Sequence, residues 1–154
     1  EKNFQVRYFN ERRICLIHIR EMALQDKPRL RQLYLESRRT TFYWDDPELM
    51  HLEDFDRDTE AELVFVAEVE ETVIGFISLY VPDNFIHCLF VDARYKGQGA
   101  GHLLLEKAKH HLELPMKLKC LSRNTPALAF YEKEGWKKVR EINVPDAYWN
   151  MIHQ

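Results

Sequence analysis

A glycine-rich stretch in the middle of the chain has the residue types and spacing that most directly suggest chemistry. Residues 94–101 read Arg-Tyr-Lys-Gly-Gln-Gly-Ala-Gly, after an apolar run at 85–91 and before an amphipathic segment that ends near Leu112. This order predicts a strand, a glycine-rich turn and a helix. The first N–H groups of a helix have no partner within it, and the helix dipole favours an anion there. Glycines let that backbone approach a ligand closely, and Arg94 and Lys96 add positive charge, so the stretch predicts a phosphate or pyrophosphate site.

Two common nucleotide-binding motifs do not fit this stretch. The dinucleotide fingerprint needs a third glycine where the chain has His102, and an acidic residue after the next strand, where it has Ser122 and Arg123. A Walker loop needs Gly-Lys followed by Ser or Thr, and the chain has no such sequence. An unrelated nucleotide-binding domain is therefore disfavoured. The other alternative is a glycine turn that joins a strand to a helix and binds nothing.

The pattern Arg-x-x-Gly-x-Gly at residues 94–99 resembles the acyl-CoA pyrophosphate loop of the GNAT N-acetyltransferase superfamily. Residues 124–136 resemble the N…A..FYEK.GF segment of that family, with Trp136 in place of the usual Phe. Residues 73–76, Val-Ile-Gly-Phe, are similar to its third strand. The resemblance covers roughly residues 62–144, and three motifs in the right order and spacing make it specific.

The resemblance implies an N-acetyltransferase that uses acetyl-CoA as cosubstrate and transfers the acetyl group to a primary amine. The amine would attack directly in a ternary complex, without an acyl-enzyme. The pantetheine arm would lie as a pseudo-strand on the backbone of residues 85–91, and a backbone N–H at a bulge near Leu89 or Phe90 would hold the thioester oxygen. The residues expected to bind acetyl-CoA are Leu89, Phe90, Val91, Arg94, Lys96, Gly97, Gln98, Gly99, Ala100, Gly101, Asn124 and Tyr131.

A protein on the same fold can also bind acyl-CoA without catalysis, as a sensor or a partner-binding module. Such a protein would be expected to have a damaged phosphate loop or to lack Tyr131, and neither is the case in this sequence. The catalytic interpretation is therefore preferred.

Acyl transfer to an amine requires a proton acceptor, because the neutral form of a lysine-like amine costs about 4.6 kcal/mol at pH 7. His87 is the candidate base, since it lies in the middle of the strand expected to form the cleft wall and imidazole titrates near neutrality. Similar sequences often carry an acidic residue there, so the alternative is a strand histidine with a structural hydrogen bond. Glu68 and Tyr80, on neighbouring strands, are further candidates that would act through water.

Tyr131 is the candidate general acid, because the resemblance places it close to the sulfur of acetyl-CoA, in the helix that starts near Pro126. A phenol with a pKa near ~10 can hydrogen-bond or protonate a thiolate whose conjugate acid has a pKa near ~8.5. The alternative is a core aromatic residue paired with Phe130. Asn124 could hydrogen-bond the pantetheine arm, cap the helix, or do both.

The acceptor pocket is expected to form from the first helices and the closing hairpin. Acidic residues between positions 45 and 58 follow a group of aromatic residues, which would suit a cationic amine through charge and ring faces. The alternative places the aromatic residues in the core and the acids on a solvated helix face. Metabolite, antibiotic and protein amines are all compatible acceptors. The aromatic candidates are Phe42, Tyr43, Trp44, Tyr148 and Trp149.

Composition narrows the class of protein. A chain of 154 residues, 45% of them apolar, fits one domain over residues 1–154 with a substantial core. The net charge of −3 argues against nucleic-acid binding, and no apolar run is long enough to span a membrane. No signal peptide is visible at residues 1–5, and three cysteines without a Cys-x-x-Cys pair are typical of a reducing compartment, so we expect a cytoplasmic protein.

Neither the cysteines nor the histidines form a metal-binding pattern. Each cysteine lies singly in an apolar stretch, where a small core residue is expected, and a nucleophilic role for Cys88 or Cys120 lacks an activating partner in the sequence. His110 and His111 are adjacent and point about 100° apart on a helix, so they cannot share a metal. We therefore expect no metal cofactor, and the resemblance is compatible with a homodimer.

Apolar periodicity and turn residues predict the elements that position these side chains. Strands are expected at 13–19, 63–69, 73–81, 85–91, 116–121, 136–144 and 147–152, and helices at 26–39, near 47–55, from the glycine turn to about 112, and at 126–134. This order predicts an α/β (α+β) fold, with a mixed, mostly antiparallel sheet of about seven strands and helices on both faces. The resemblance implies that the strands at 85–91 and 116–121 run parallel and splay apart to make a cleft.

Overall fold

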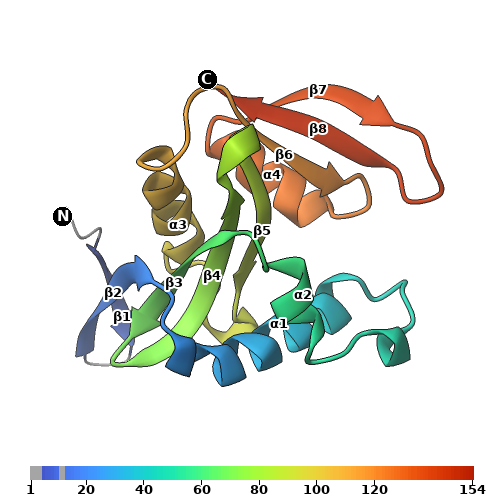
Figure 1. Ribbon diagram of the computed structural model, residues 1–154. Coiled ribbons are helices and arrows are strands. Elements are labelled where there is room, and N and C mark those ends of the chain that lie inside the picture. Colours follow the sequence, from blue (N-terminus) through green and yellow to red (C-terminus); the bar gives the residue numbers. More distant parts are fainter. Residues whose placement is uncertain (1–4, 11–12) are drawn as a thin grey trace.

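One sheet of eight strands organises the residues that the computed structural model describes, which are 5–10 and 13–154. The order across the sheet is β1-β2-β3-β4-β5-β6-β8-β7 (Figure 1). The seven predicted strands are confirmed, and β1 is an additional strand at the edge of the sheet. The strands are β1 (Gln5–Asn10), β2 (Arg13–Glu21), β3 (Leu63–Val69), β4 (Thr72–Tyr80), β5 (Phe85–Val91), β6 (Met116–Leu121), β7 (Lys137–Ile142) and β8 (Tyr148–His153).

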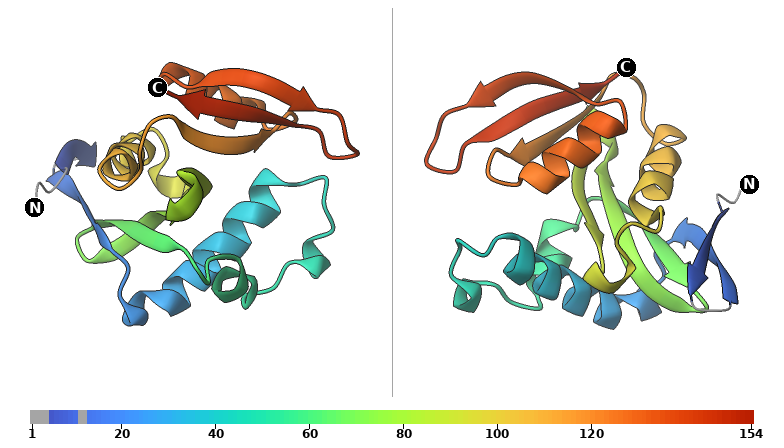
Figure 2. Two further views of the ribbon diagram at one scale, coloured as in Figure 1. Left: turned by 45° about the horizontal axis from the view of Figure 1, so that its top comes forward. Right: turned by 180° about the vertical axis from the view of Figure 1, so that it is seen from behind.

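All neighbouring strands run antiparallel except β5 and β6, which are parallel and separate after a short contact. Beyond this contact β5 stays with β4, whereas β6 continues alongside β8 (Figure 2). The predicted splayed pair of parallel strands is therefore confirmed. The only two paired positions of β5 and β6 in the described chain are Phe85 with Lys117 and Ile86 with Leu118.

A β-bulge lies in β5 next to the point of separation. Ser78 of β4 pairs with Cys88, and the next residue, Leu79, pairs with Ile86. His87 is therefore the extra residue on β5. A bulge bends its strand and increases the local twist. Because His87 directly follows Ile86, the bend in β5 begins where its pairing with β6 ends.

Four α-helices cover the two faces of the sheet (Figure 2). Along β3, Val64 and Val66 belong to the core under α1 and α2, whereas Phe65 and Ala67 belong to the core under α3 and α4. This alternation confirms the predicted arrangement of helices on both faces. No helix in the described residues is both long and apolar enough to cross a membrane. The helices are α1 (Lys27–Thr41), α2 (Asp54–Asp58), α3 (Ala100–Lys109) and α4 (Thr125–Lys133).

Two local features refine the predictions. The helix expected near residues 47–55 is a 3-10 turn (Pro47–Leu49) followed by the short α2, because Met50 is buried in an extended conformation that ends the turn. The predicted hairpin between β3 and β4 is confirmed. Glu70 and Glu71 form its turn with positive φ values of 48° and 67°, so this turn adopts a conformation that usually favours glycine or asparagine.

Candidate functional site

The glycine-rich turn connects β5 to α3 and leaves the N-terminus of α3 open. After Val91 the chain forms a 3-10 turn (Ala93–Tyr95), and Gly97 and Gly99 then adopt φ values of 79° and 94°, which favour glycine. Gly99 is the N-cap residue of α3, and no side chain caps this helix. The Leu103 N–H donates to the Gly99 carbonyl at 3.1 Å, so the N–H groups that precede it in the first turn remain available to an anion.

Gly101, the third glycine of the stretch, has a role in packing. A Cβ atom at this position would lie 3.0 Å from the ring of Phe130 in α4. Glycine therefore allows α3 and α4 to approach each other closely. The motif thus also sets the position of α4 relative to the turn.

Asp92 connects the glycine-rich turn to the rest of the fold. Its carboxylate accepts hydrogen bonds from the Arg94 guanidinium at 2.8 Å and from the Arg29 guanidinium of α1 at 2.7 Å. Arg29 also donates to the Val73 carbonyl at 3.1 Å. The hydrogen bonds from Arg94 and Arg29 hold the pKa of Asp92 well below its usual value. Arg94 is thus occupied by Asp92, whereas Lys96 is exposed and forms no ion pair with any described residue.

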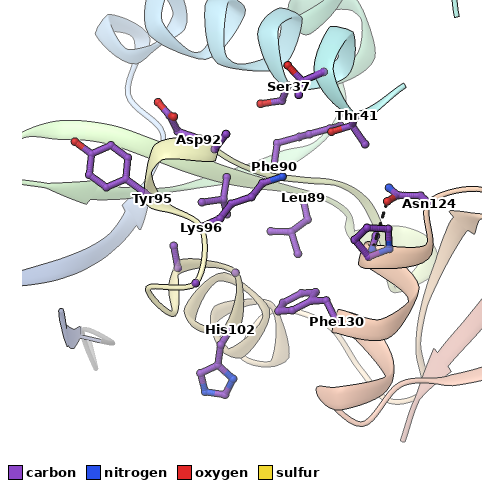
Figure 3. A pocket seen from close by; sticks show the side chains of 18 of the residues that line it. Ser37, Thr41, Leu89, Phe90, Asp92, Tyr95, Lys96, His102, Asn124 and Phe130 are labelled. Atoms are coloured by element: carbon purple, nitrogen blue, oxygen red, sulfur yellow. Dashed lines mark hydrogen bonds between the residues drawn. The ribbon is translucent and has the colours of Figure 1, made fainter. Parts of the chain in front are cut away.

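A cavity of about 640 Å³ lies beside this turn, bordered by α1, the end of β5, the turn itself and α4 (Figure 3). Arg94 and Gln98 are the two predicted acetyl-CoA residues that do not line it. The structure therefore brings together residues from three separate parts of the sequence. The predicted residues in its wall are Leu89, Phe90, Val91, Lys96, Gly97, Gly99, Ala100, Gly101, Asn124 and Tyr131.

One wall of the cavity comes from α1 and was not predicted. It consists of Leu33 and four polar residues, Glu36, Ser37, Thr40 and Thr41. Residues 37, 40 and 41 are three and four positions apart, so they share one face of the helix. The sequence shows this polar stripe, but a stripe of hydroxyl groups looks the same whether it faces solvent or a ligand.

The main chain of β5 presents hydrogen-bonding groups to the gap between β5 and β6. The Phe90 carbonyl lies 2.9 Å from where a Cβ on Gly75 would be, and the Asp92 N–H donates to a carbonyl of β4 at 2.7 Å, so both groups face β4. Main-chain groups alternate in direction along a strand, so those of Leu89 and Val91 point away from β4. They can pair with an extended ligand in the gap, whereas Phe90 contributes its ring.

The bulge expected near Leu89 or Phe90 lies instead at His87. Leu89 pairs with Ile77 and Phe90 pairs with Phe76, without a shift in register. The prediction was wrong by at least two residues. The register between β4 and β5 depends on how the two strands pack, and the sequence of β5 alone does not determine it. Leu89 therefore belongs to the regular part of the strand.

Tyr131 lies on α4 with its side chain at the cavity. Its ring packs against those of Phe130 and Trp136, with centroids 5.4 and 6.0 Å apart. Its hydroxyl has no hydrogen-bond partner within the described part of the chain. Burial raises the pKa of the phenol above its ordinary value. Tyr131 is therefore protonated at neutral pH and free to donate a hydrogen bond.

Asn124 stands at the start of α4 and at the edge of the cavity (Figure 3). Its side-chain oxygen accepts a hydrogen bond from the Ala127 N–H at 3.4 Å, which confirms the predicted helix cap. The NH₂ group of the same amide is a separate donor. Capping of α4 and contact with a ligand are therefore compatible uses of this side chain.

His87 lies in a second cavity, of about 540 Å³, together with Lys117 and Lys119 of β6. Its Nδ1 atom is 2.7 Å from a carboxylate oxygen of Glu62. The Glu62 side chain is only 8% exposed, whereas that of His87 is 42% exposed. Interactions with the Cys88 thiol and with Glu62 raise the pKa of His87 to about 10. At neutral pH, His87 is therefore an imidazolium paired with a buried carboxylate.

The two other candidate bases lie in different surroundings. Tyr80 lines the second cavity with His87. Glu68 accepts a hydrogen bond from Arg20 at 3.1 Å and lines neither of the two cavities. His87 and Tyr80 therefore line the same cavity, and Glu68 lies outside it.

Cys88 and Cys120 are free and buried, as expected for small core residues. Burial raises the pKa of the Cys120 thiol to about 11, and a protonated thiol is a poor nucleophile. Within the described residues, no group of three or more His, Cys, Asp or Glu side chains is placed to hold a metal ion.

The aromatic residues suggested for the acceptor pocket do not gather in one place. Phe42 and Trp44 contact each other after the end of α1, with centroids 5.7 Å apart, and Tyr43 is 81% exposed. Trp149 lies on β8, and the centroid of its ring is 5.0 Å from the Nζ atom of Lys138. None of the five aromatic candidates lines either of the two cavities.

The acidic run after these aromatic residues is partly neutralised within the protein. Asp54 and Asp56 form ion pairs with Arg38 and Arg31 of α1, at 3.0 and 2.7 Å. These contacts hold α2 against α1. Asp54 and Asp56 therefore have a structural role. This agrees with the alternative hypothesis, in which the acidic residues do not bind a cationic amine.

Comparison with known proteins places the chain in a family. Residues 27–136 match the acetyltransferase (GNAT) family. The chain belongs to this family, in agreement with the uncapped α3 and the cavity beside it. No curated protein matches the chain significantly.

Solved structures share the fold over most of the chain. The apo form of YjaB from Escherichia coli is 25% identical, with a TM-score of 0.74, and the match covers 89% of this chain and 97% of YjaB. PaiA N-acetyltransferase from Thermoplasma acidophilum, in complex with coenzyme A, is 22% identical, with a TM-score of 0.75 and coverage of 90% and 98%. Arabidopsis thaliana Naa50, in complex with the bisubstrate analogue CoA-Ac-MVNAL, is 16% identical, with a TM-score of 0.66 and coverage of 90% and 98%.

Replacing Asp92 with Asn should weaken the anchor of the glycine-rich turn. The variant loses the charge that pairs with Arg29 and Arg94, so we expect the free energy of unfolding to fall by about 1–3 kcal/mol, measured by urea unfolding at pH 7. Asp56→Asn is the control, since its carboxylate is 34% exposed against 9% for Asp92, so solvent screens its pairing with Arg31 and its loss should matter less. Equal losses in the two variants would contradict the anchoring role of Asp92.

Proposed function

We propose that the protein is an N-acetyltransferase that transfers the acetyl group of acetyl-CoA to a primary amine by direct attack in a ternary complex. The observation that carries the proposal is the uncapped N-terminus of α3 at Gly99, beside a cavity whose wall includes Leu89 and Val91. Membership of the GNAT family supports it. The structural similarity to PaiA N-acetyltransferase, solved with coenzyme A, also supports it.

Acetyl-CoA is placed in the first cavity. Its pyrophosphate accepts hydrogen bonds from the N–H groups of the first turn of α3, where the helix dipole favours negative charge, and Lys96 adds a compensating positive charge. The pantetheine arm lies extended in the gap and pairs with the main chain of Leu89 and Val91. Asn124 supplies its NH₂ group from the other side. The thioester then lies where β5 and β6 separate.

The reaction forms a C–N bond and breaks the C–S bond of the thioester. The amine nitrogen attacks the carbonyl carbon, and the Leu89 N–H stabilises the negative charge that develops on the oxygen. The sulfur leaves as a thiolate, to which the Tyr131 hydroxyl donates a hydrogen bond. Because its pKa is raised, Tyr131 stabilises the thiolate more by this bond than by complete proton transfer. The proton of the amine passes to His87 in those molecules whose imidazole is neutral.

Substitutions at Gly99 test the pyrophosphate site. Gly99→Ala strains a left-handed residue and should weaken acetyl-CoA binding moderately, whereas Gly99→Asp also places a carboxylate where the pyrophosphate binds. We expect the Asp variant to bind at least ~10-fold more weakly than the Ala variant, a difference of about 1.4 kcal/mol. Isothermal calorimetry measures both affinities, and circular dichroism verifies the fold. If Gly99→Asp bound acetyl-CoA as tightly as the wild type, the proposed binding mode would be wrong.

Tyr131→Phe tests the leaving-group contact. Free thiol should appear when acetyl-CoA is mixed with a panel of primary amines, and the variant should lower kcat at least ~10-fold while the Kd for acetyl-CoA stays unchanged. Tyr43→Phe is the matched control, because this tyrosine is 81% exposed and lines neither cavity. An unchanged kcat in Tyr131→Phe would remove the residue from the mechanism, and binding without thiol release for any amine would indicate a non-catalytic acyl-CoA sensor.

The pH dependence of the rate tests His87. Only its neutral form accepts a proton, and that form increases as pH rises toward the pKa of about 10, so kcat/KM should rise over the same range. Glu62→Gln removes the carboxylate that stabilises the imidazolium, so the rising limb should move to lower pH. The titration of the free acceptor is the same in both proteins and cannot produce such a shift. Superimposable profiles would show that His87 is not the base.

A further inference from the structure

The second cavity lies next to the point where β5 and β6 separate. Phe85 and His87 line it from β5, and Lys117 and Lys119 line it from β6. Since pairing of the two strands ends at Ile86, the cavity flanks the start of the gap. A molecule bound in this cavity therefore lies beside the gap in which the proposed function places the thioester.

The charges that face this cavity are not balanced. Lys117 and Lys119 are exposed and form no ion pair with any described residue. Glu62 is already engaged, because its buried carboxylate lies 2.7 Å from His87. Asp83 is the other acidic residue in the wall. The Lys119 ammonium lies 5.2 Å from the centroid of the Tyr148 ring, a contact that leaves its charge uncompensated. Two ammonium groups and one carboxylate outside ion pairs leave the cavity positive.

The wall of the cavity supplies donors of the kind that bind a carboxylate. Lys117 and Lys119 are two residues apart on β6, so they project from the same face of the sheet. Asn150 of β8 pairs with Lys119 in the sheet and also lines the cavity. Two ammonium groups and a carboxamide provide charged and neutral donors for the oxygens of one acid group. The rings of Tyr80 and Phe85 offer apolar surface for the rest of a small molecule.

We infer that this cavity is the acceptor site and that it selects a small primary amine that also carries a carboxylate, as a free amino acid does. The inference rests on the proposed function and adds the class of acceptor to it. Lys117 and Lys119 hold the carboxylate, and the amino group faces the gap. This is the opposite charge preference to the cationic acceptor suggested by the acidic run at 45–58. A second positive charge on the acceptor would be repelled by both lysines and by the protonated His87.

The reaction of such an acceptor balances without a further reagent. The ammonium group loses two protons in all, its nitrogen forms the bond to the acetyl carbon, and the C–S bond breaks with its electrons going to sulfur. One proton ends on the thiol of coenzyme A and the other in solvent. The product is an N-acetyl amino acid that has lost the charge of its amino group and kept that of its carboxylate.

Matched pairs of acceptors test the inference directly. Thiol release from acetyl-CoA is measured with L-phenylalanine and L-phenylalaninamide, with L-leucine and L-leucinamide, and with spermidine. Amidation lowers the pKa of the amino group, which by itself favours the amide, so a higher rate with the acid reports recognition of the carboxylate. We expect kcat/KM to be at least about tenfold higher for the acids, which corresponds to a charge-assisted contact.

The outcomes separate this inference from the proposed function. A higher kcat/KM for the amides or for spermidine would show that the acceptor is not selected by its carboxylate. The proposal that the protein is an acetyltransferase would still stand. Absence of thiol release with every amine, while calorimetry shows acetyl-CoA binding, overturns both.

Charge-removing variants locate the recognition. The double variant Lys117→Gln/Lys119→Gln should raise KM for the acids at least about tenfold and abolish the preference over the amides, while KM for acetyl-CoA stays unchanged. Lys117→Arg/Lys119→Arg keeps the charge and should retain the preference. Lys107→Gln/Lys109→Gln is the control, because it removes the same charge from α3, outside both cavities. Retention of the acid preference in the Lys117/Lys119 glutamine variant would overturn the inference.

Discussion

The incomplete pairing of β5 and β6 is the constraint on which the site depends. Main-chain groups inside a protein require partners, and two paired positions with β6 leave the following residues of β5 without a neighbouring strand on the side away from β4. The bulge at His87 bends β5 where this contact ends, and the outward groups of Leu89 and Val91 then face a gap. In a continuous sheet, the main-chain groups of Leu89 and Val91 would be hydrogen-bonded to the next strand and could not bind a ligand. The fold is therefore complete only when an extended ligand or water occupies the position of the missing strand.

The same separation explains why the glycine-rich turn is tied down so firmly. The turn begins at the end of β5, where β4 is still paired with the strand but β6 has already separated from it. Asp92 supplies the missing attachment through Arg29 of α1 and through Arg94 within the turn itself. Arg94, which was predicted to add positive charge at the ligand, thus holds the loop, and Lys96 remains exposed beside the cavity. Gly101 completes the arrangement by admitting the ring of Phe130, which brings α4 against α3.

Local patterns predicted most of the elements, and the failures share a physical cause. Alternation, helix caps and the glycine motif act within a few residues, so seven strands, α3, α4 and the part of the first cavity built by the glycine-rich turn were predictable. The ion pair between Arg29 and Asp92 joins residues 63 positions apart, and the contact between Glu62 and His87 joins residues 25 positions apart. Such contacts depend on how the elements pack. His87 was therefore recognised as a candidate, whereas its protonation could not be inferred without Glu62.

The surroundings of His87 connect the choice of acceptor to its activation. An acidic residue at this position could accept a proton but would also stabilise the ammonium form of the amine. His87 and Glu62 together carry no net charge, so the two lysines dominate the field in the second cavity. Nearby cations lower the pKa of an ammonium group and so offset part of the cost of its deprotonation, at 1.36 kcal/mol per pKa unit. On the proposed assignment, the lysines that select a carboxylate also favour the neutral, nucleophilic form of the amino group attached to it.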